Sequence, residues 1–187
     1  MATIREGNQT ILLIVDMQAG VMAELQDAER VIAKASLAVD RARNENVPVI
    51  WVQHENDEMP KGSPQWQLAS GLQAAEGEVV VGKGYNSSFE ETELENILTG
   101  LSATHIALAG ASTNWCVRAT AYAALERGYD LTLISDAHGT ENLEPGDGSK
   151  IAAADVVLEF NTVMTWLRYP GRRSGTATAA EIDFTKP

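Results

Sequence analysis

Short apolar runs rich in β-branched residues alternate along the chain with longer stretches of helical periodicity. The apolar runs cover residues 11–15, 47–53, 79–81, 105–109 and 131–135. Consecutive apolar positions are typical of strands that helices cover on both faces of a parallel sheet. The alternation therefore predicts an α/β fold built from βαβ units.

Helix-start and helix-stop residues locate the helices between these strands. Asp27 is the expected cap of a first helix that ends near Asn46, and its apolar side chains recur at the spacing of one helix face. Gly128 is the expected left-handed end of a helix over residues 114–127. A further helix lies within residues 151–168, where clear signals for its ends are missing.

Three other segments complete the predicted organisation. Thr92 and Glu95 have the spacing of a capping box, and Gly100 is the matching stop signal. The connection over residues 55–78 lacks periodicity, which is typical of a functional lid. From residue 171 to residue 187 we expect a loop or a short edge strand and then a polar end.

The length and composition fit one globular domain over residues 1–187. With 44% apolar and 21% charged residues, the chain has the composition of ordinary globular proteins and can bury a core without disulfides. Its lone cysteine cannot form an internal disulfide, and the apolar run at residues 11–15 is too short for a signal peptide or a membrane span. We therefore expect a cytoplasmic protein without a membrane segment.

The net charge of −12 at pH 7 argues against polyanionic partners. Lys and Arg are scattered, so neither nucleic acid nor an anionic membrane would find a basic patch. The first strand is not followed by Gly-x-Gly-x-x-Gly, which argues against a dinucleotide-binding domain. A small-molecule substrate is the expected partner, and no cofactor is predicted.

Three reactive side chains directly follow predicted strands. Asp16 follows the first strand, Lys83 follows the third, and Cys116 lies in the turn that enters the helix after the fourth. In an open parallel sheet these ends share one edge, where ligands bind. A helix N-terminus and a nearby ammonium favour the thiolate, and a carboxylate can take the thiol proton and return it to a leaving amine. The three residues predict nucleophilic catalysis by the cysteine.

Each of these residues also has an ordinary structural interpretation. Cys116 can be a small buried apolar residue in an Ala-rich helix, Asp16 can cap a turn, and Lys83 can be solvated in a loop. Their shared location at one sheet edge favours the functional interpretation over these three separate ones.

Three ordered motifs surround the same residues. They are Val-Asp-Met-Gln at residues 15–18, Lys-Gly-Tyr-Asn-Ser-Ser-Phe at 83–89, and Gly-Ala-Ser-Thr-Asn-Trp-Cys-Val-Arg-Ala-Thr at 110–120. In type, order and spacing they closely resemble the isochorismatase-like cysteine hydrolases. The resemblance covers about residues 10–184, nearly the whole chain.

The resemblance implies a three-layer α/β/α fold with a Rossmann-like sheet of six parallel strands in the order 3-2-1-4-5-6. It implies that Asp16, Lys83 and Cys116 form a catalytic triad. It also implies a cis peptide bond between Ala111 and Ser112. The backbone N–H groups of Ser112 and Cys116 would then form an oxyanion hole for a tetrahedral intermediate.

The family includes nicotinamidases, carbamoylsarcosine and ureidoacrylate amidohydrolases, streptothricin hydrolases, and isochorismatases that cleave a vinyl ether without a thiol. The presence of Cys116 favours C–N bond hydrolysis in a small amide, lactam or ureido compound through an acyl-enzyme. The alternatives are a vinyl-ether hydrolase and a non-catalytic metabolite-binding protein, which would be expected to lack a triad residue. Relatives are commonly homo-oligomers, so we expect one here, with residues 171–187 as a candidate swapped or docking segment.

Metal-bearing nicotinamidases carry Asp-x-His-Pro-x-x-His after the second strand. This chain has Gln-His-Glu-Asn-Asp-Glu at residues 53–58, which retains His54 but lacks the preceding Asp and the second His. No metal site is therefore predicted, with a divalent ion on His54 and Asp57 as the alternative.

Side chains near the same sheet edge are candidates for contact with the substrate, because small-ligand pockets are usually walled by apolar and aromatic groups with a few polar ones. The predicted contacts are Gln18, His54, Trp66, Tyr85, Phe89 and Trp115. For His54 an exposed loop position is an equal alternative. Trp51 is expected in the core and His105 is expected to be structural, whereas His138 is expected to be an exposed residue on the catalytic side of the sheet.

Overall fold

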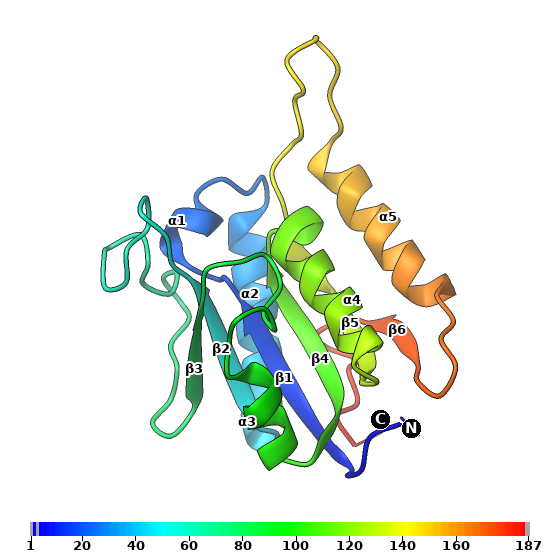
Figure 1. Ribbon diagram of the computed structural model, residues 1–187. Coiled ribbons are helices and arrows are strands. Elements are labelled where there is room, and N and C mark those ends of the chain that lie inside the picture. Colours follow the sequence, from blue (N-terminus) through cyan, green and yellow to red (C-terminus); the bar gives the residue numbers. More distant parts are fainter. Residues whose placement is uncertain (1, 3, 186–187) are drawn as a thin grey trace.

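A six-stranded parallel sheet forms the centre of the computed structural model, which describes residues 2 and 4–185 (Figure 1). Its strand order is β3-β2-β1-β4-β5-β6, which confirms the order implied by the resemblance. The strands are β1 (Gln9–Val15), β2 (Val49–His54), β3 (Val79–Lys83), β4 (Ala103–Ala111), β5 (Asp130–Gly139) and β6 (Ser174–Ala177). Five of them overlap the apolar runs seen in the sequence, although the run over residues 47–53 begins two residues before β2, and β6 is the edge strand in the tail.

Helices cover both faces of the sheet (Figure 1). They are α1 (Ala19–Met22), α2 (Ala28–Asn44), α3 (Leu94–Gly100), the π-helical turn η1 (Thr113–Val117), α4 (Arg118–Glu126) and α5 (Ala153–Trp166). Alternate β1 side chains enter two cores. Leu12 and Ile14 pack with α2, whereas Ile11 and Leu13 pack with α3, α4 and α5. This three-layer arrangement explains why the central strands are apolar at consecutive positions.

The predicted capping box before α3 does not form. The N-cap position is Glu93, which makes no side-chain capping hydrogen bond, and the helix begins at Leu94. The Thr92 hydroxyl instead donates to the Ser88 carbonyl at 2.6 Å and accepts the Leu94 N–H at 3.3 Å. The preceding turn competes for the hydroxyl that a capping box would have used.

The other helix-end predictions have mixed outcomes. Gly128 has φ +90° and ends α4 as expected. The helix α3 ends at Gly100 as predicted, although the left-handed residue is Ser102, with φ +54°. Asp27 holds the N-cap position of α2, but its side chain makes no capping hydrogen bond.

The tail packs against its own chain as far as the structure describes it. β6 pairs with β5, and the Arg41 guanidinium donates to the carbonyls of Ala179 and Ile182 at 3.0 and 2.7 Å. Ile182 and Phe184 are buried in the core around α2. Residues 171–185 therefore pack within the fold of the single chain, and the swapped or docking role stays a prediction; residues 186–187 lie outside the described part.

Two negative findings apply to residues 2 and 4–185. No helix there combines the length and apolar character needed to cross a membrane. No group of three or more His, Cys, Asp or Glu side chains is arranged there as metal ligands would be.

Candidate active site

The carboxyl ends of the central strands bring the three predicted reactive residues together. Asp16 directly follows β1, Lys83 is the last residue of β3, and Cys116 lies in η1 after β4. Between Asp16 and Lys83 stands His54, the last residue of β2, whose register partner is Lys83. Residues that are far apart in sequence therefore meet because parallel strands end at a common edge.

Lys83 is the centre of the contacts in this cluster. Its ammonium Nζ lies 2.6 Å from Asp16 Oδ2 and donates to Cys116 Sγ at 3.2 Å and to the Tyr85 carbonyl at 3.0 Å. His54 Nδ1 lies 3.3 Å from the same nitrogen. The side chains of Lys83 and Asp16 are only 0% and 2% exposed. A buried ion pair is thus in direct contact with the thiol.

Burial determines the protonation of this cluster. Desolvation raises the pKa of Asp16, although the Lys83 charge partly opposes the shift. Desolvation together with the Asp16 charge raises the pKa of Cys116 to about 12, and Lys83 again opposes the shift. This corrects the expected thiolate, because burial and the carboxylate outweigh the ammonium. The resting site holds a neutral thiol beside a carboxylate whose affinity for a proton is increased.

Local backbone geometry places Asp16 and the turn before Cys116. Asp16 has φ +51°, so the chain leaves β1 in a left-handed conformation while its N–H still donates to the Val52 carbonyl at 2.9 Å. Gly110 has φ +141°, and a Cβ there would overlap the backbone of Val15. Only glycine allows β4 to pass so close to the end of β1.

The turn that carries Cys116 is held from below by buried side chains. The peptide bond between Ala111 and Ser112 is cis, and the Ser112 carbonyl accepts the N–H groups of Trp115 and Val117 at 3.1 and 3.2 Å. Thr113 Oγ1 lies 2.9 Å from Nδ1 of His138. Burial lowers the pKa of His138 to about 4, so the imidazole is neutral near pH 7.

The remaining predictions for histidine and tryptophan residues concern His105, His138 and Trp51, which lie outside this turn. His138 Nε2 lies 3.1 Å from Asn161 Oδ1 on α5, so it links α5 to the turn that carries Cys116. His105 is buried between Thr10 and Thr132, with its ring nitrogens 3.3 and 2.8 Å from their hydroxyls. Trp51 is fully buried. His105 and Trp51 occupy the structural positions expected from the sequence. The expectation that His138 is exposed is wrong, because its ring is buried between Thr113 and Asn161.

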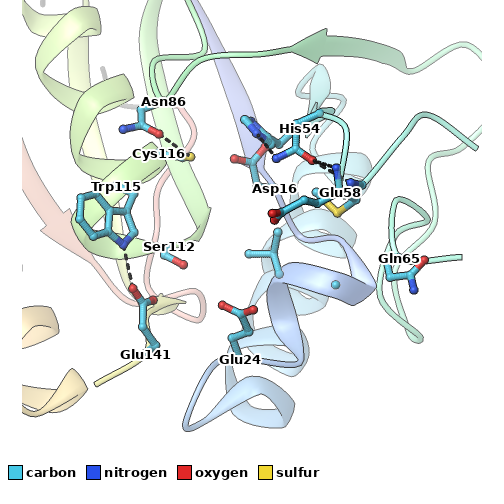
Figure 2. Close-up of a pocket in the computed structure, with 14 residues that line it drawn as sticks. Asp16, Glu24, His54, Glu58, Gln65, Asn86, Ser112, Trp115, Cys116 and Glu141 are labelled. Carbon is cyan, nitrogen blue, oxygen red and sulfur yellow. Dashed lines mark hydrogen bonds between the residues drawn. The ribbon is translucent and has the colours of Figure 1, made fainter. Parts of the chain in front are cut away.

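A cavity of about 550 Å³ opens above the cluster (Figure 2). It is lined by Asp16, Gly20, Val21, Glu24, His54, Asn56, Glu58, Met59, Gln65, Asn86, Ser112, Trp115, Cys116 and Glu141. Of the six predicted substrate contacts, His54 and Trp115 are on this surface. Trp115 is 48% exposed, and its indole N–H donates to Glu141 at 2.7 Å.

Gln18 is a structural link and does not line the cavity. Its side chain is fully buried and donates to the carbonyls of His54 and Trp66 at 2.9 and 3.0 Å, while its Oε1 accepts the His54 N–H at 2.7 Å. These bonds join the ends of β1 and β2 to the long connection over residues 55–78. The predicted substrate contact at Gln18 is therefore replaced by a role in positioning the cavity wall.

The three other predicted contacts also lie off the cavity surface. Phe89 is buried, with its ring centroid 6.1 Å from that of Tyr129. Tyr85 is 44% exposed, and it approaches the cluster through its backbone carbonyl. Trp66 likewise contributes its carbonyl, which accepts from Gln18 and Gln53 at 3.0 and 2.7 Å. Tyr85 and Trp66 therefore position Lys83 and Gln18 through their backbone carbonyls.

Several wall residues were missed because they come from segments without periodicity. Glu24 follows the four-residue helix α1, and Glu58, Met59 and Gln65 lie in the connection over residues 55–78. A single turn of helix leaves no recurrent apolar pattern, so the sequence offers no signal for α1. Asn86 could have been found, since it lies inside the motif at residues 83–89.

The alternative of a divalent ion on His54 and Asp57 finds no support in the geometry. His54 Nδ1 faces the Lys83 ammonium at 3.3 Å, and its Nε2 lies 3.4 Å from the Asn56 side-chain nitrogen. Asp57 does not line the cavity. A cation at His54 would meet the Lys83 charge, so these residues do not fit a metal.

The family of the chain follows from comparison with known proteins. The family model of the isochorismatase domain matches residues 10–167, so the chain belongs to this family. A streptothricin hydrolase of Streptomyces noursei is 32% identical over 151 residues, which cover 76% of this chain and 60% of that protein. The chain thus spans less than two thirds of that relative. The secreted isochorismatase effector Isc1 of Verticillium dahliae is 29% identical, with coverage of 83% and 87%.

Solved structures show the same architecture. The crystal structure of an isochorismatase from Pseudomonas putida KT2440 superposes with a TM-score of 0.82 at 27% sequence identity, covering 92% of this chain and 89% of that chain. The similarity in fold therefore extends over most of the chain.

Proposed function

We propose that this protein is a cysteine hydrolase that cleaves a C–N bond in a small amide, lactam or ureido compound. The observation that carries the proposal is the contact of Cys116 Sγ with the buried Lys83–Asp16 pair at the base of an open cavity. Two relatives support the reaction class, the streptothricin hydrolase and a maleamate amidohydrolase of Pseudomonas putida that is 24% identical over 157 residues. Vinyl-ether cleavage does not require a thiol, so the contact of Cys116 with the ion pair favours C–N bond hydrolysis.

In the first step Cys116 Sγ attacks the substrate carbonyl carbon as its proton passes to Asp16. The raised pKa of Asp16 suits it to accept this proton, and the Lys83 ammonium stabilises whichever partner is charged. Negative charge develops on the carbonyl oxygen. We assign its stabilisation to the backbone N–H groups of Ser112 and Cys116, because both residues line the cavity and the first N–H groups of a helix lack internal acceptors.

In the second step the C–N bond breaks and the proton on Asp16 moves to the leaving nitrogen. The acyl group remains on Cys116 as a thioester. Water then attacks the thioester carbonyl, Asp16 accepts the water proton and returns it to sulfur, and the carboxylic acid leaves. The site ends with a neutral thiol and an ionised Asp16, as it began.

The test is ammonia release from a panel of primary amides and ureido compounds, combined with intact-mass detection of the acyl-enzyme. We expect one class of compound to release ammonia and add its acyl mass to Cys116. Cys116→Ala and Asp16→Asn should both abolish turnover while leaving the fold unchanged by circular dichroism. Ammonia release by Cys116→Ala at the wild-type rate would refute the nucleophile.

We also propose a single domain over residues 1–187, a cytoplasmic location and a homo-oligomeric state. The single sheet, whose two faces pack against the helices, supports the single domain. The lone cysteine supports the cytoplasmic location, although the relative Isc1 is described as secreted. Sedimentation equilibrium of the purified protein tests the assembly, and a monomer at micromolar concentration would refute it.

A further inference from the structure

The cavity wall is acidic, and it lacks a positive side chain to balance that charge. Glu24, Glu58 and Glu141 all line it, whereas no Lys or Arg belongs to the lining within residues 2 and 4–185. His54 is the remaining basic group on the surface, and burial and the Lys83 charge lower its pKa, which keeps it neutral near pH 7. Lys83 itself is fully buried under the cavity and neutralises Asp16.

Glu24 and Glu58 are left without compensation. Neither carboxylate has a hydrogen bond or an ion pair to another side chain in the part of the chain that the structure describes. Both belong to exposed segments, and they lie across the cavity from Cys116 and Trp115 (Figure 2). Like charges that face one cavity repel each other, and a bound cation would relieve that repulsion.

The side of the cavity next to Cys116 also suits a cation. Glu141 accepts the Trp115 indole N–H and the Thr140 hydroxyl, both at 2.7 Å, and these bonds lower its pKa so that it remains ionised. The same bond fixes the half-exposed Trp115 ring on the cavity wall, where an aromatic face attracts cations. The net charge of −12 adds long-range attraction for a positive ligand.

Asp16 adds an observation from the base of the same cavity. Asp16 is 1% exposed yet lines the cavity, and its Oδ1 accepts no hydrogen bond in the described structure. A buried carboxylate oxygen without a donor is costly unless another molecule contacts it. The acidic wall and the unsatisfied oxygen therefore belong to one site.

We propose that the substrate is an amide that carries a positively charged amine or guanidinium group at some distance from the scissile bond. Glu24 and Glu58 bind this group while the carbonyl lies at Cys116. The inference rests on the proposed function for the bond that is cleaved, and on the charges of the wall for the class of substrate. Anionic amides are excluded by repulsion from the same carboxylates.

The binding test uses three amides that differ only at the far end, namely 5-aminopentanamide, hexanamide and adipamate, which are cationic, neutral and anionic. Titration calorimetry with the Cys116→Ala protein measures their affinities without turnover. Two exposed charge contacts predict about tenfold tighter binding of the cation than of hexanamide. The preference should shrink as salt rises from about 0.01 M to about 0.15 M. Equal affinities, tighter binding of adipamate, or no measurable binding of 5-aminopentanamide would overturn the proposal.

A charge-matched control separates the wall from the overall charge. Glu24→Gln with Glu58→Gln should remove the preference for 5-aminopentanamide. Glu76→Gln with Glu126→Gln changes the net charge equally at exposed positions off the cavity and should retain the preference. Loss of the preference in both double variants would show that the net charge of the protein causes the preference for the cationic amide. This result would overturn the assignment to Glu24 and Glu58.

Turnover of the same amides by the unmodified protein tests the proposed function separately. Preferential binding of the cationic amide without ammonia release would refute amide hydrolysis but support the preference of the cavity for a cationic ligand. Ammonia release from all three amides with equal kcat/KM would support hydrolysis and refute the preference for a cation.

Discussion

Replacing Lys83 by Met leaves the Asp16 carboxylate buried without the cation that lies 2.6 Å from it. Both side chains are nearly inaccessible, at 0% and 2% exposure, so solvent cannot screen or solvate the remaining charge. Removing one partner of a buried pair costs about 3–5 kcal/mol of unfolding free energy. For a domain of this size, that corresponds to a fall of roughly 6–20 °C in Tm. We expect Lys83→Met to fold at low pH and to be severely destabilised near pH 8.

The direction of the Asp16 pKa shift determines how the loss of stability in Lys83→Met depends on pH. Burial already raises the pKa of Asp16 in the wild type, and loss of Lys83 raises it further. A carboxyl with a raised folded-state pKa binds its proton more tightly when folded. Its contribution to stability is therefore complete below the unfolded pKa, about 3.9, and is lost as pH rises through the folded value. The loss of unfolding free energy in Lys83→Met should be small near pH 4 and largest above pH 7.

Urea unfolding at pH 4, 6 and 8, followed by circular dichroism, measures these free energies. The surface pair Lys34–Asp136 provides a control, because it has a similar separation of 3.2 Å but side-chain exposures of 40% and 21%. Lys34→Met should cost less than about 1 kcal/mol at any pH. The double variant Asp16→Asn with Lys83→Met should recover much of the loss. A deficit for Lys83→Met no larger than that of the control, or one independent of pH, would refute the reasoning.

Three further predictions concern the surroundings of the pair. If Asp16 takes the thiol proton, iodoacetamide should alkylate Cys116 of the wild type at a nearly constant rate from about pH 6 to 8. In Asp16→Asn the alkylation should be slower, and its rate should rise about tenfold per pH unit; intact mass measures both rates. Gln18→Ala should destabilise the protein by about 3 kcal/mol in urea and speed trypsin cleavage at Lys61, because it leaves buried groups of the long connection unpaired. Gly110→Ala should cost about 3 kcal/mol or more in the same urea assay, because a Cβ has no room there.

The sheet could be predicted because its central strands are buried on both faces. Residues 11–15 and 105–109 contain almost only apolar side chains, and the structure places them in β1 and β4 at the middle of the sheet. The positions of Asp16, Lys83 and Cys116 follow from the same pattern. Once parallel strands are recognised, any residue that directly follows one is placed at the common edge.

The cavity wall could not be predicted, because long-range hydrogen bonds set its shape. Gln18 looked like a substrate contact, yet it bonds the backbone of His54 and the Trp66 carbonyl. Which partner a buried amide finds depends on how the connection over residues 55–78 folds, and that segment has no periodic pattern. The capping box predicted at Thr92 does not form for a related reason, because the nearby Ser88 carbonyl accepts the hydrogen bond from the Thr92 hydroxyl.

The protonation states divide the site into two parts with separate roles. Lys83 neutralises Asp16, burial keeps Cys116 and His54 neutral, and the base of the cavity therefore carries little net charge. The field inside the cavity is then set by the carboxylates on its wall, of which Glu24 and Glu58 lie across the cavity from Cys116 (Figure 2). Changes to the wall should alter KM and substrate choice while leaving kcat for a bound neutral amide intact, because they remove binding shared by ground and transition states. Changes to the pair at the base should instead alter kcat, since its proton transfer belongs to the reaction itself.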